Sequence, residues 1–167
     1  MNALKVILSI FIIGTFSIAC SKKVTHEKSL FSDPIVIKIL EFQDTRNTKQ
    51  LIGYLKAKDK KYRSLSALAF ASIQDTVALP YLYFSLMSDE DAATRKAAAY
   101  SIGQTADSSS VISLFQALEG ETSRENQKTI LEDIGKCSNK KAVQFLTDFN
   151  PQKTELIEGK LLGMFRS

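Results

Sequence analysis

Histidine, cysteine and tryptophan are scarce in this sequence, whose 167 residues include one histidine, two cysteines and no tryptophan. One histidine is too few for an HExxH zinc site, and because it lies in a polar stretch we expect no Ser-His-Asp triad. The chain also lacks a P-loop and a G-x-G-x-x-G segment. Seven glycines and three prolines are few, which favours long helices over turn-rich β-structure. These absences predict a helical protein without a catalytic residue, a metal or a cofactor.

Four residues, which form three separate candidates, are of types found in catalytic sites, and each candidate has a simpler interpretation. His26 lies in the polar segment 21–31, where a solvated linker residue is expected rather than a ligand or a base. Ser138 and Lys141 have the Ser-x-x-Lys spacing of some acyl-transfer enzymes, but the other motifs of those enzymes are absent. Cys137 has no base beside it in the sequence, which indicates a partly buried structural thiol.

Residues 1–19 are predicted to be a signal peptide and not part of the fold. They contain one charge, Lys5, and an apolar run that is too short for a comfortable transmembrane helix. The run ends in "SIAC", which resembles the lipobox of bacterial lipoproteins: Ala19 and Cys20 match it, whereas Ser17 stands where leucine is usual. The resemblance implies that Cys20 is lipidated and holds the protein at a bacterial cell envelope, facing the periplasm. The alternatives are an ordinary secretory leader or a buried N-terminal segment.

The rest of the chain has a mild charge balance. Residues 20–167 contain 21 basic and 18 acidic side chains, which does not indicate a nucleic-acid partner. Residues 20–33 are predicted to be a tether, because the segment "SKKVTHEKSLF" is polar and aperiodic. A lipid on Cys20 would leave Cys137 without a disulfide partner, so we expect the domain to be held by its core alone.

A repeat of 32 residues runs through the remainder of the chain. The segment "ALAFASIQDTVALPYL" at 67–82 aligns without a gap with "AYSIGQTADSSSVISL" at 99–114. A further step of 32 residues forward and a step of 31 backward give the same pattern. Two sets of equivalent residues, one residue from each copy, are Ile39, Phe70, Ile102 and Ile134, and Leu51, Leu82, Leu114 and Leu146. Four copies therefore cover residues 34–149, and periods of this length indicate stacked structural repeats.

Each copy is predicted to be a pair of helices. Residues that favour the N-cap position precede each first helix, at Asp33, Asp59, Asp91 and Ser123, and each second helix, at Asp44, Asp75, Asp107 and Asn139. The second helices repeat apolar residues on one face: Leu79, Leu82 and Leu86; Val111, Leu114 and Leu118; Val143, Leu146 and Phe149. Glycines near the ends of first helices, Gly103 and Gly135, predict close helix packing or C-capping.

The segment "TRKAAAYSIG" at 94–103, with the acidic turn and the apolar helix that follow it, resembles a HEAT repeat. The bilin-lyase-type subclass, which has a Val-Arg pair, an alanine cluster and Leu-Gly, is the most similar. Arg63 and Arg95 match the arginine of that pair; the departures are Gln127 in the arginine column and Tyr62 and Thr94 in the valine column. The resemblance covers about residues 34–149 and implies an all-α solenoid of about four HEAT-like helix pairs. It implies an architecture and almost no chemistry, so a bilin lyase rests on the repeat subclass alone.

The repeat boundaries divide residues 34–167 into units of about 34–57, 58–89, 90–121 and 122–150, with a half unit at 151–167. The half unit contains "TELIEGKLLGMFRS", which resembles the first helix of a fifth unit without its second helix. Because solenoids usually end in a polar cap, we expect a longer parent protein or a truncated copy.

Three apolar side chains of the second unit lie off the repeated face and form the candidate partner-binding site. At 100° per residue, Val77, Tyr81 and Phe84 point away from Leu79 and its apolar face. The equivalent residues of the third unit are polar: Ser109, Ser113 and Gln116. The resemblance implies that second helices line a groove, where exposed aromatic residues are typical interface anchors. The alternative is that a flanking helix covers them.

The sequence therefore predicts a non-catalytic scaffold at the envelope that binds a protein partner, with no small-molecule substrate. The alternative is an enzyme fragment. The segments "AFASIQD" at 69–75 and "AYSIGQ" at 99–104 are similar to the helical N-terminal region of some lipoprotein peptidyl-prolyl isomerases. That similarity implies a targeting region whose cyclophilin domain lies downstream.

Overall fold

The computed structural model describes residues 30–137, 139–150 and 154–167, and in these residues the secondary structure is helical without a strand. The signal peptide, Cys20, His26, Ser138 and most of the predicted tether lie outside the described residues. The described elements are η1 (Leu30–Ser32), α2 (Pro34–Asp44), α3 (Thr48–Tyr54), α4 (Lys60–Ile73), η2 (Thr76–Ala78), α5 (Leu79–Ser88), α6 (Ala92–Thr105), η3 (Ser108–Ser110), α7 (Val111–Gly120), α8 (Arg124–Lys136), α9 (Lys140–Asp148) and α10 (Thr154–Arg166).

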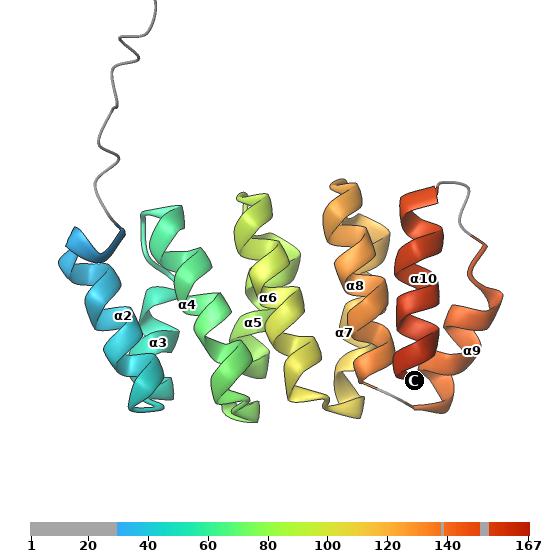
Figure 1. The fold of residues 1–167 in the computed structure, drawn as a ribbon, viewed down its shortest axis with the longest axis horizontal. Coiled ribbons are helices and arrows are strands. Elements are labelled where there is room, and N and C mark those ends of the chain that lie inside the picture. The colour runs from blue at the N-terminus through green and yellow to red at the C-terminus, as the bar shows by residue number, and fades with distance from the viewer. Residues whose placement is uncertain (1–29, 138, 151–153) are drawn as a thin grey trace, which may run out of the picture.

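The helices form two layers. Helices α2, α4, α6, α8 and α10 stand side by side in one row, with α3, α5 and α7 behind them and α9 beside α10 at the right-hand end (Figure 1). Within the first row, α4 packs on α6, α6 on α8 and α8 on α10. Each element contacts its neighbours in sequence or the next copy, which is the arrangement of an α-solenoid. The predicted all-α solenoid fold is confirmed.

N-caps set the start of the helices. The side chains of Asp33, Asp59, Asp91 and Ser123 accept hydrogen bonds from backbone N–H groups in the first turns of α2, α4, α6 and α8. Asp75 and Asp107 cap the short helices η2 and η3, and Asn139 caps α9. One predicted cap is wrong: Asp44 is the last residue of α2, and Asn47 caps α3. The chain turns between α2 and α3 through Arg46, which has a left-handed backbone with φ 52°. The residue that caps α3 is therefore Asn47, three positions after Asp44.

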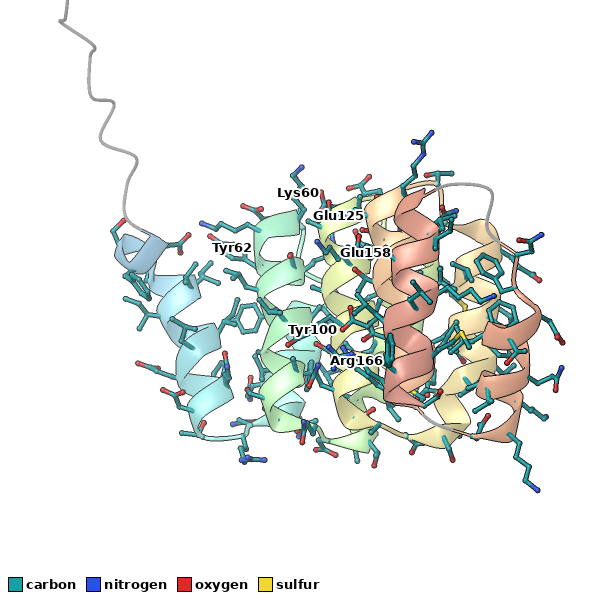
Figure 2. All side chains as sticks on the ribbon, turned by 45° about the vertical axis from the view of Figure 1, so that its right-hand side comes forward. Lys60, Tyr62, Tyr100, Glu125, Glu158 and Arg166 are labelled. Atoms are coloured by element: carbon teal, nitrogen blue, oxygen red, sulfur yellow. The ribbon has the colours of Figure 1, made fainter. Side chains whose placement is uncertain are left out.

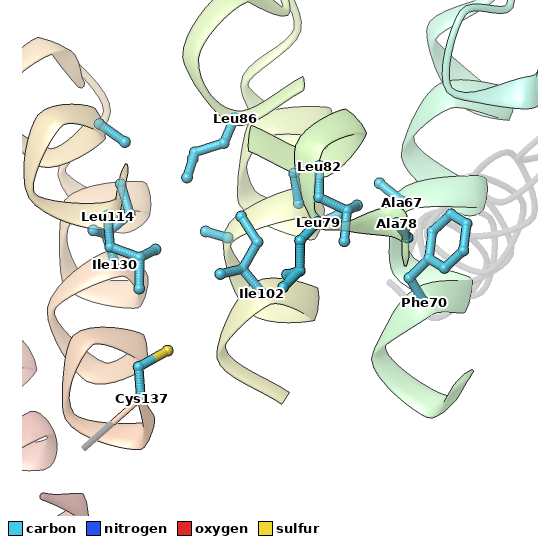
Figure 3. Close-up of a cluster of buried hydrophobic side chains, with 14 of the residues drawn as sticks. Ala67, Phe70, Ala78, Leu79, Leu82, Leu86, Ile102, Leu114, Ile130 and Cys137 are labelled. Atoms are coloured by element: carbon cyan, nitrogen blue, oxygen red, sulfur yellow. The ribbon is translucent and has the colours of Figure 1, made fainter. Parts of the chain in front are cut away.

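The core lies between the two layers and runs through consecutive units (Figure 3). Leu82, Ile102, Leu114 and Ile130 are completely buried. In the fourth unit the predicted apolar face is partly wrong, because Val143 is 44% exposed whereas Ala142 and Leu146 are buried. Helix α9 begins directly after its cap at Asn139, without the 3-10 turn that precedes α5 and α7, so the helix starts three residues earlier in the repeat.

Gly103 and Gly135 allow close packing and do not cap helices. A Cβ atom at Gly103 would lie 2.2 Å from Oδ1 of Asp133 on α8, and one at Gly135 would lie 2.0 Å from the carbonyl oxygen of Gly163 on α10. The left-handed residues that end α4 and α6 are Gln74 and Ala106, at φ 55° and 51°. Of the two roles that the sequence left open for these glycines, the structure therefore supports close packing.

Candidate functional site

Helix α5 has a buried face and an exposed apolar face. Leu79, Leu82 and Leu86 point into the core, whereas Val77 in η2 and Tyr81 and Phe84 in α5 are 63%, 38% and 68% exposed. No described helix covers Val77 or Phe84. Large apolar side chains that remain in water on one helix face are typical of interaction surfaces, so a partner role for these three residues remains a prediction.

The neighbouring second helices have no aromatic residue at the position of Phe84. The residue 31 positions before Phe84 is Gly53 on α3, and the residue 32 positions after it is Gln116 on α7. A Cβ atom at Gly53 would meet nothing within 4 Å, so the surface beside α5 is open there. The aromatic residues are therefore confined to one unit of the solenoid.

A hollow of about 410 Å³ opens between the end of α3 and α5. Six residues line it: Leu55, Lys56, Pro80, Tyr81, Phe84 and Ser85. The ammonium group of Lys56 lies 5.7 Å from the centroid of the Tyr81 ring, within the range of a cation–π interaction. Lys56 forms no ion pair with a described carboxylate. The hollow thus combines apolar walls with one cation at its edge.

Similar hollows recur one repeat apart. Beside the aromatic hollow, a space of about 360 Å³ is lined by Phe84, Ser88, Arg63 and Asp89, among others. Its equivalent between α5 and α7 measures about 290 Å³ and is lined by Gln116, Gly120, Arg95 and Glu121. In the hollow between α5 and α7, Gln116 takes the place of Phe84 and Gly120 takes the place of Ser88. This hollow therefore provides an internal control for the aromatic site.

Buried arginine–carboxylate pairs form one wall of each of these two hollows. Arg63 donates two hydrogen bonds to Asp89, of 2.7 and 2.9 Å, and two from Nη1 to the carbonyl oxygens of Ala57 and Lys58. Arg95 donates in the same way to Glu121 and to the carbonyl oxygens of Asp89 and Glu90. Each pair fastens the start of a first helix to the end of its own second helix and to the preceding loop.

The pair of Arg95 and Glu121 lowers the pKa of the Glu121 carboxyl group. Burial raises the pKa of Glu121, but hydrogen bonds from Arg95, the Ser123 backbone N–H and Asn126 outweigh that effect and bring the pKa down to about 2. In the fourth unit Gln127 replaces the arginine and donates a single hydrogen bond of 2.6 Å to the carbonyl oxygen of Glu121. These carboxylates were not among the predicted residues, although the spacing of 32 residues between Asp89 and Glu121 equals that between Arg63 and Arg95.

Cys137 does not have the surroundings of a reactive thiol. Cys137 is buried, and burial, with the nearby Asp133, raises the pKa of its thiol to about 12, so the reactive thiolate is not formed near neutral pH. Among the described residues, no group of three histidine, cysteine or acidic side chains has the geometry to hold a metal ion. None of the described helices has the length and apolar character needed to cross a membrane.

Comparison with known proteins supports the architecture. Residues 48–127, from α3 into α8, match the HEAT repeats family. No curated protein is significantly similar to the chain. The match covers just under half of the chain, and the row of paired helices is consistent with a HEAT-type α-solenoid. HEAT repeats commonly mediate protein interactions.

Proposed function

We propose that this HEAT-type solenoid is a non-catalytic scaffold that binds a protein partner through Val77, Tyr81 and Phe84. We further propose that a lipid on Cys20 holds it at a bacterial cell envelope, with the solenoid facing the periplasm. A membrane and one protein partner are thus the two attachments of the molecule.

One observation carries the binding site: Tyr81 and Phe84 stand exposed beside a hollow of about 410 Å³, while the equivalent residues of the next unit are polar. Exposed aromatic side chains lower the solubility of a protein, and Phe84, which is 68% exposed, contributes little to the stability of the fold. At protein interfaces, such anchors next to a pocket typically cost about 2 kcal/mol or more when truncated. A binding role therefore accounts for the exposure of Phe84 beside Tyr81.

Photo-crosslinking from matched positions tests the site. Ser88 lines the hollow beside Phe84, and Gly120 is its equivalent 32 residues later, where a side chain would meet nothing within 4 Å. A photoreactive residue at position 88 should give a discrete adduct in envelope preparations, and one at position 120 should not. The adduct at 88 should fall at least about thirtyfold when Tyr81 and Phe84 are both changed to serine.

The stability of the double variant decides what that loss means. Because Tyr81 and Phe84 are exposed, the thermal unfolding midpoint of the double serine variant should stay within about 3 °C of the wild type. A collapsed midpoint would show that the pair is part of the core. Equal adducts at positions 88 and 120 would also overturn the site.

The membrane attachment has its own test. Several acyl chains on Cys20, at about 0.8 kcal/mol per buried CH₂ group, would anchor the protein stably. Metabolic labelling with palmitate should mark the wild type, and Cys20→Ser should remain unlabelled and unable to fractionate with membranes as a mature form. Equal labelling of both would end this part of the proposal.

A second candidate function is favoured by the similarity of segments 69–75 and 99–104 to lipoprotein peptidyl-prolyl isomerases. In that case the solenoid is the non-catalytic N-terminal part of an enzyme and presents substrate proteins to a cyclophilin domain. The genomic reading frame beyond residue 167 distinguishes the two candidates, since only the second requires it to encode that domain.

A further inference from the structure

Asp133 on α8 is a carboxyl group buried against α6. Its side chain is completely buried, and its Oδ2 atom is the one buried side-chain oxygen or nitrogen of the described residues that has no hydrogen-bond partner. The opposing residue on α6 is Gly103, where a Cβ atom would lie 2.2 Å from Oδ1 and 2.4 Å from Cγ of Asp133. The glycine therefore leaves the space that the carboxyl group occupies.

The equivalent positions of the two preceding units have neutral side chains. They are Ser101 on α6 and Ala69 on α4, both of them buried. Ser101 donates a hydrogen bond of 2.6 Å to the carbonyl oxygen of Ala67 on α4. A protonated Asp133 has an O–H donor for the corresponding bond to Ala99, the residue 32 positions after Ala67, whereas a carboxylate has no donor. The neutral acid therefore suits this place in the repeat better than the carboxylate does.

The charged groups that face Asp133 come from α8 and α10. Nζ of Lys136 lies 2.7 Å from Oδ1 of Asp133 and 3.5 Å from Oε1 of Glu132. The same ammonium group lies 4.9 Å from the centroid of the Tyr100 ring on α6, and Arg166 on α10 pairs with Glu132 at 3.0 Å; Figure 2 labels Tyr100 and Arg166. An ionised Asp133 would thus direct one oxygen to Lys136 and leave the other buried without a donor, which costs free energy.

The other titratable groups of the packed elements do not supply that donor. The thiol of Cys137 is buried, and burial raises its pKa to about 12, so it is neutral near pH 7. Asp107 caps η3 and is itself an acid. The remaining charged side chains of α6, α7 and α9 lie at the other end of their helices or are exposed to solvent: Arg95, Lys96, Glu119, Lys140, Lys141 and Asp148.

We propose that Asp133 is a proton-operated lock between α6 and α8. The protonated side chain holds α8 against α6, and its ionisation allows α8 and α10 to separate from α6 together. Helices α8 and α10 are expected to move as one body because Lys128 pairs with Glu158 at 2.7 Å and a Cβ atom at Gly163 would lie 2.4 Å from the carbonyl oxygen of Leu131. This inference does not depend on the proposed partner site, which lies on α5.

The direction of the pH dependence follows from the two states of the lock. Burial raises the pKa of Asp133 in the closed state to about 7, helped by Glu132 and opposed by Lys136 and Arg166. In the opened state the carboxyl group is in water, where its pKa is about 4. Between these two values the opened state releases a proton that the closed state keeps, so opening becomes easier by up to about tenfold per pH unit as the pH rises.

Hydrogen–deuterium exchange of the full-length protein at pH 5 and pH 7, followed by mass spectrometry, tests the lock. The exchange rates are first corrected for the intrinsic pH dependence of amide exchange. The opening equilibrium of α8 and α10 should then be at least tenfold greater at pH 7 than at pH 5. At pH 7, α4 should open at least tenfold less than α8 and α10, because it stays folded when they separate from α6.

Neutral replacements of Asp133 provide the second arm. Asp133→Asn keeps the shape of the protonated carboxyl group, so at pH 7 its α8 and α10 should open at least tenfold less than those of the wild type. Their opening should also be the same at pH 5. Asp133→Ser copies Ser101 and should likewise lose the pH dependence. The matched control is Glu132→Gln, which removes a neighbouring, partly exposed carboxylate of α8 and should keep a change of at least tenfold.

Three results would overturn the proposal. The first is equal opening of α8 at both pH values in the wild type. The second is equal opening of α4 and α8 at pH 7, which would mean that the whole solenoid unfolds together. The third is the wild-type pH dependence in Asp133→Asn. Failure of both neutral variants to fold would also contradict the proposal, because they copy the form of Asp133 that holds the helices together.

Discussion

The packing of α8 against α10 makes Gly135→Ala a sharp test of the structure. A Cβ atom at Gly135 would lie 2.0 Å from the carbonyl oxygen of Gly163 and 2.6 Å from two other backbone atoms of the same residue. Ordinary van der Waals contact begins at 3.4 Å, so the two helices would have to separate by more than 1 Å. No side-chain rotation can relieve this clash, because the opposing atoms are backbone.

The magnitude follows from two opposing effects. Overpacking costs about 1–3 kcal/mol, and a backbone contact belongs at the upper end of that range. The better helix propensity of alanine returns about 1 kcal/mol. Gly135→Ala should therefore lower the free energy of unfolding by about 2 kcal/mol. The control is Gly53→Ala in α3, where the new methyl group meets nothing within 4 Å and stability should rise by about 0.5–1 kcal/mol.

Equilibrium urea unfolding followed by circular dichroism measures both changes. The slope against urea should stay the same if both variants unfold as one cooperative unit. A Gly135→Ala protein as stable as the wild type would refute the close approach of α8 and α10. Destabilisation by both alanines equally would show that the effect is not steric.

Three further predictions concern stability. Leu114→Ala, at a completely buried position, should cost about 2–5 kcal/mol in urea melts, and a change below about 0.5 kcal/mol would mean that the repeat register is wrong. Ala106→Gly should stabilise the protein by up to about 1 kcal/mol, because glycine adopts the left-handed conformation at φ 51° without steric cost; equal or lower stability would argue against that conformation. Burial raises the pKa of Asp133 to about 7, against the effect of Lys136 and Arg166 and together with that of Glu132. An acid with a raised folded pKa stabilises the fold while protonated, so wild-type stability should fall from pH 5 to pH 7. Asp133→Asn should remove this slope, and an unchanged slope would assign it to another group.

The sequence contained enough information for the architecture because repetition reinforces each local signal. The caps at Asp59, Asp91 and Ser123 and the buried leucines of α5 and α7 recur at one period, and all of them are found where the period places them. The failures occur where a unit departs from its copies. The connection before α3 is capped by Asn47 and not by Asp44, and α9 omits a 3-10 turn, which leaves Val143 exposed.

The candidate site was only partly predictable. Helical periodicity placed Tyr81 and Phe84 away from the core, but it could not show whether another helix covers them, because that depends on the spacing of units in three dimensions. One wall of the hollow beside them comes from the end of α3. The residue Lys56 of this wall lies 25 positions before Tyr81 in the sequence, beyond the reach of helical periodicity. The carboxylate partners of Arg63 and Arg95 lie 26 residues further along the chain.

The contacts of Arg95 also bear on how the number of repeat units can increase in such a solenoid. Arg95 bonds the carboxylate at the end of its own unit and the backbone of the loop before it, and those backbone carbonyls exist at every unit boundary. A tandem duplication of residues 90–121 would therefore supply a new arginine together with its own Glu121 and an equivalent loop to receive it. Gln127 would bond the second copy of that glutamate as it now bonds the first. The protein can thus grow by one complete unit in a single genetic event, while the surface around Tyr81 and Phe84 stays unaltered.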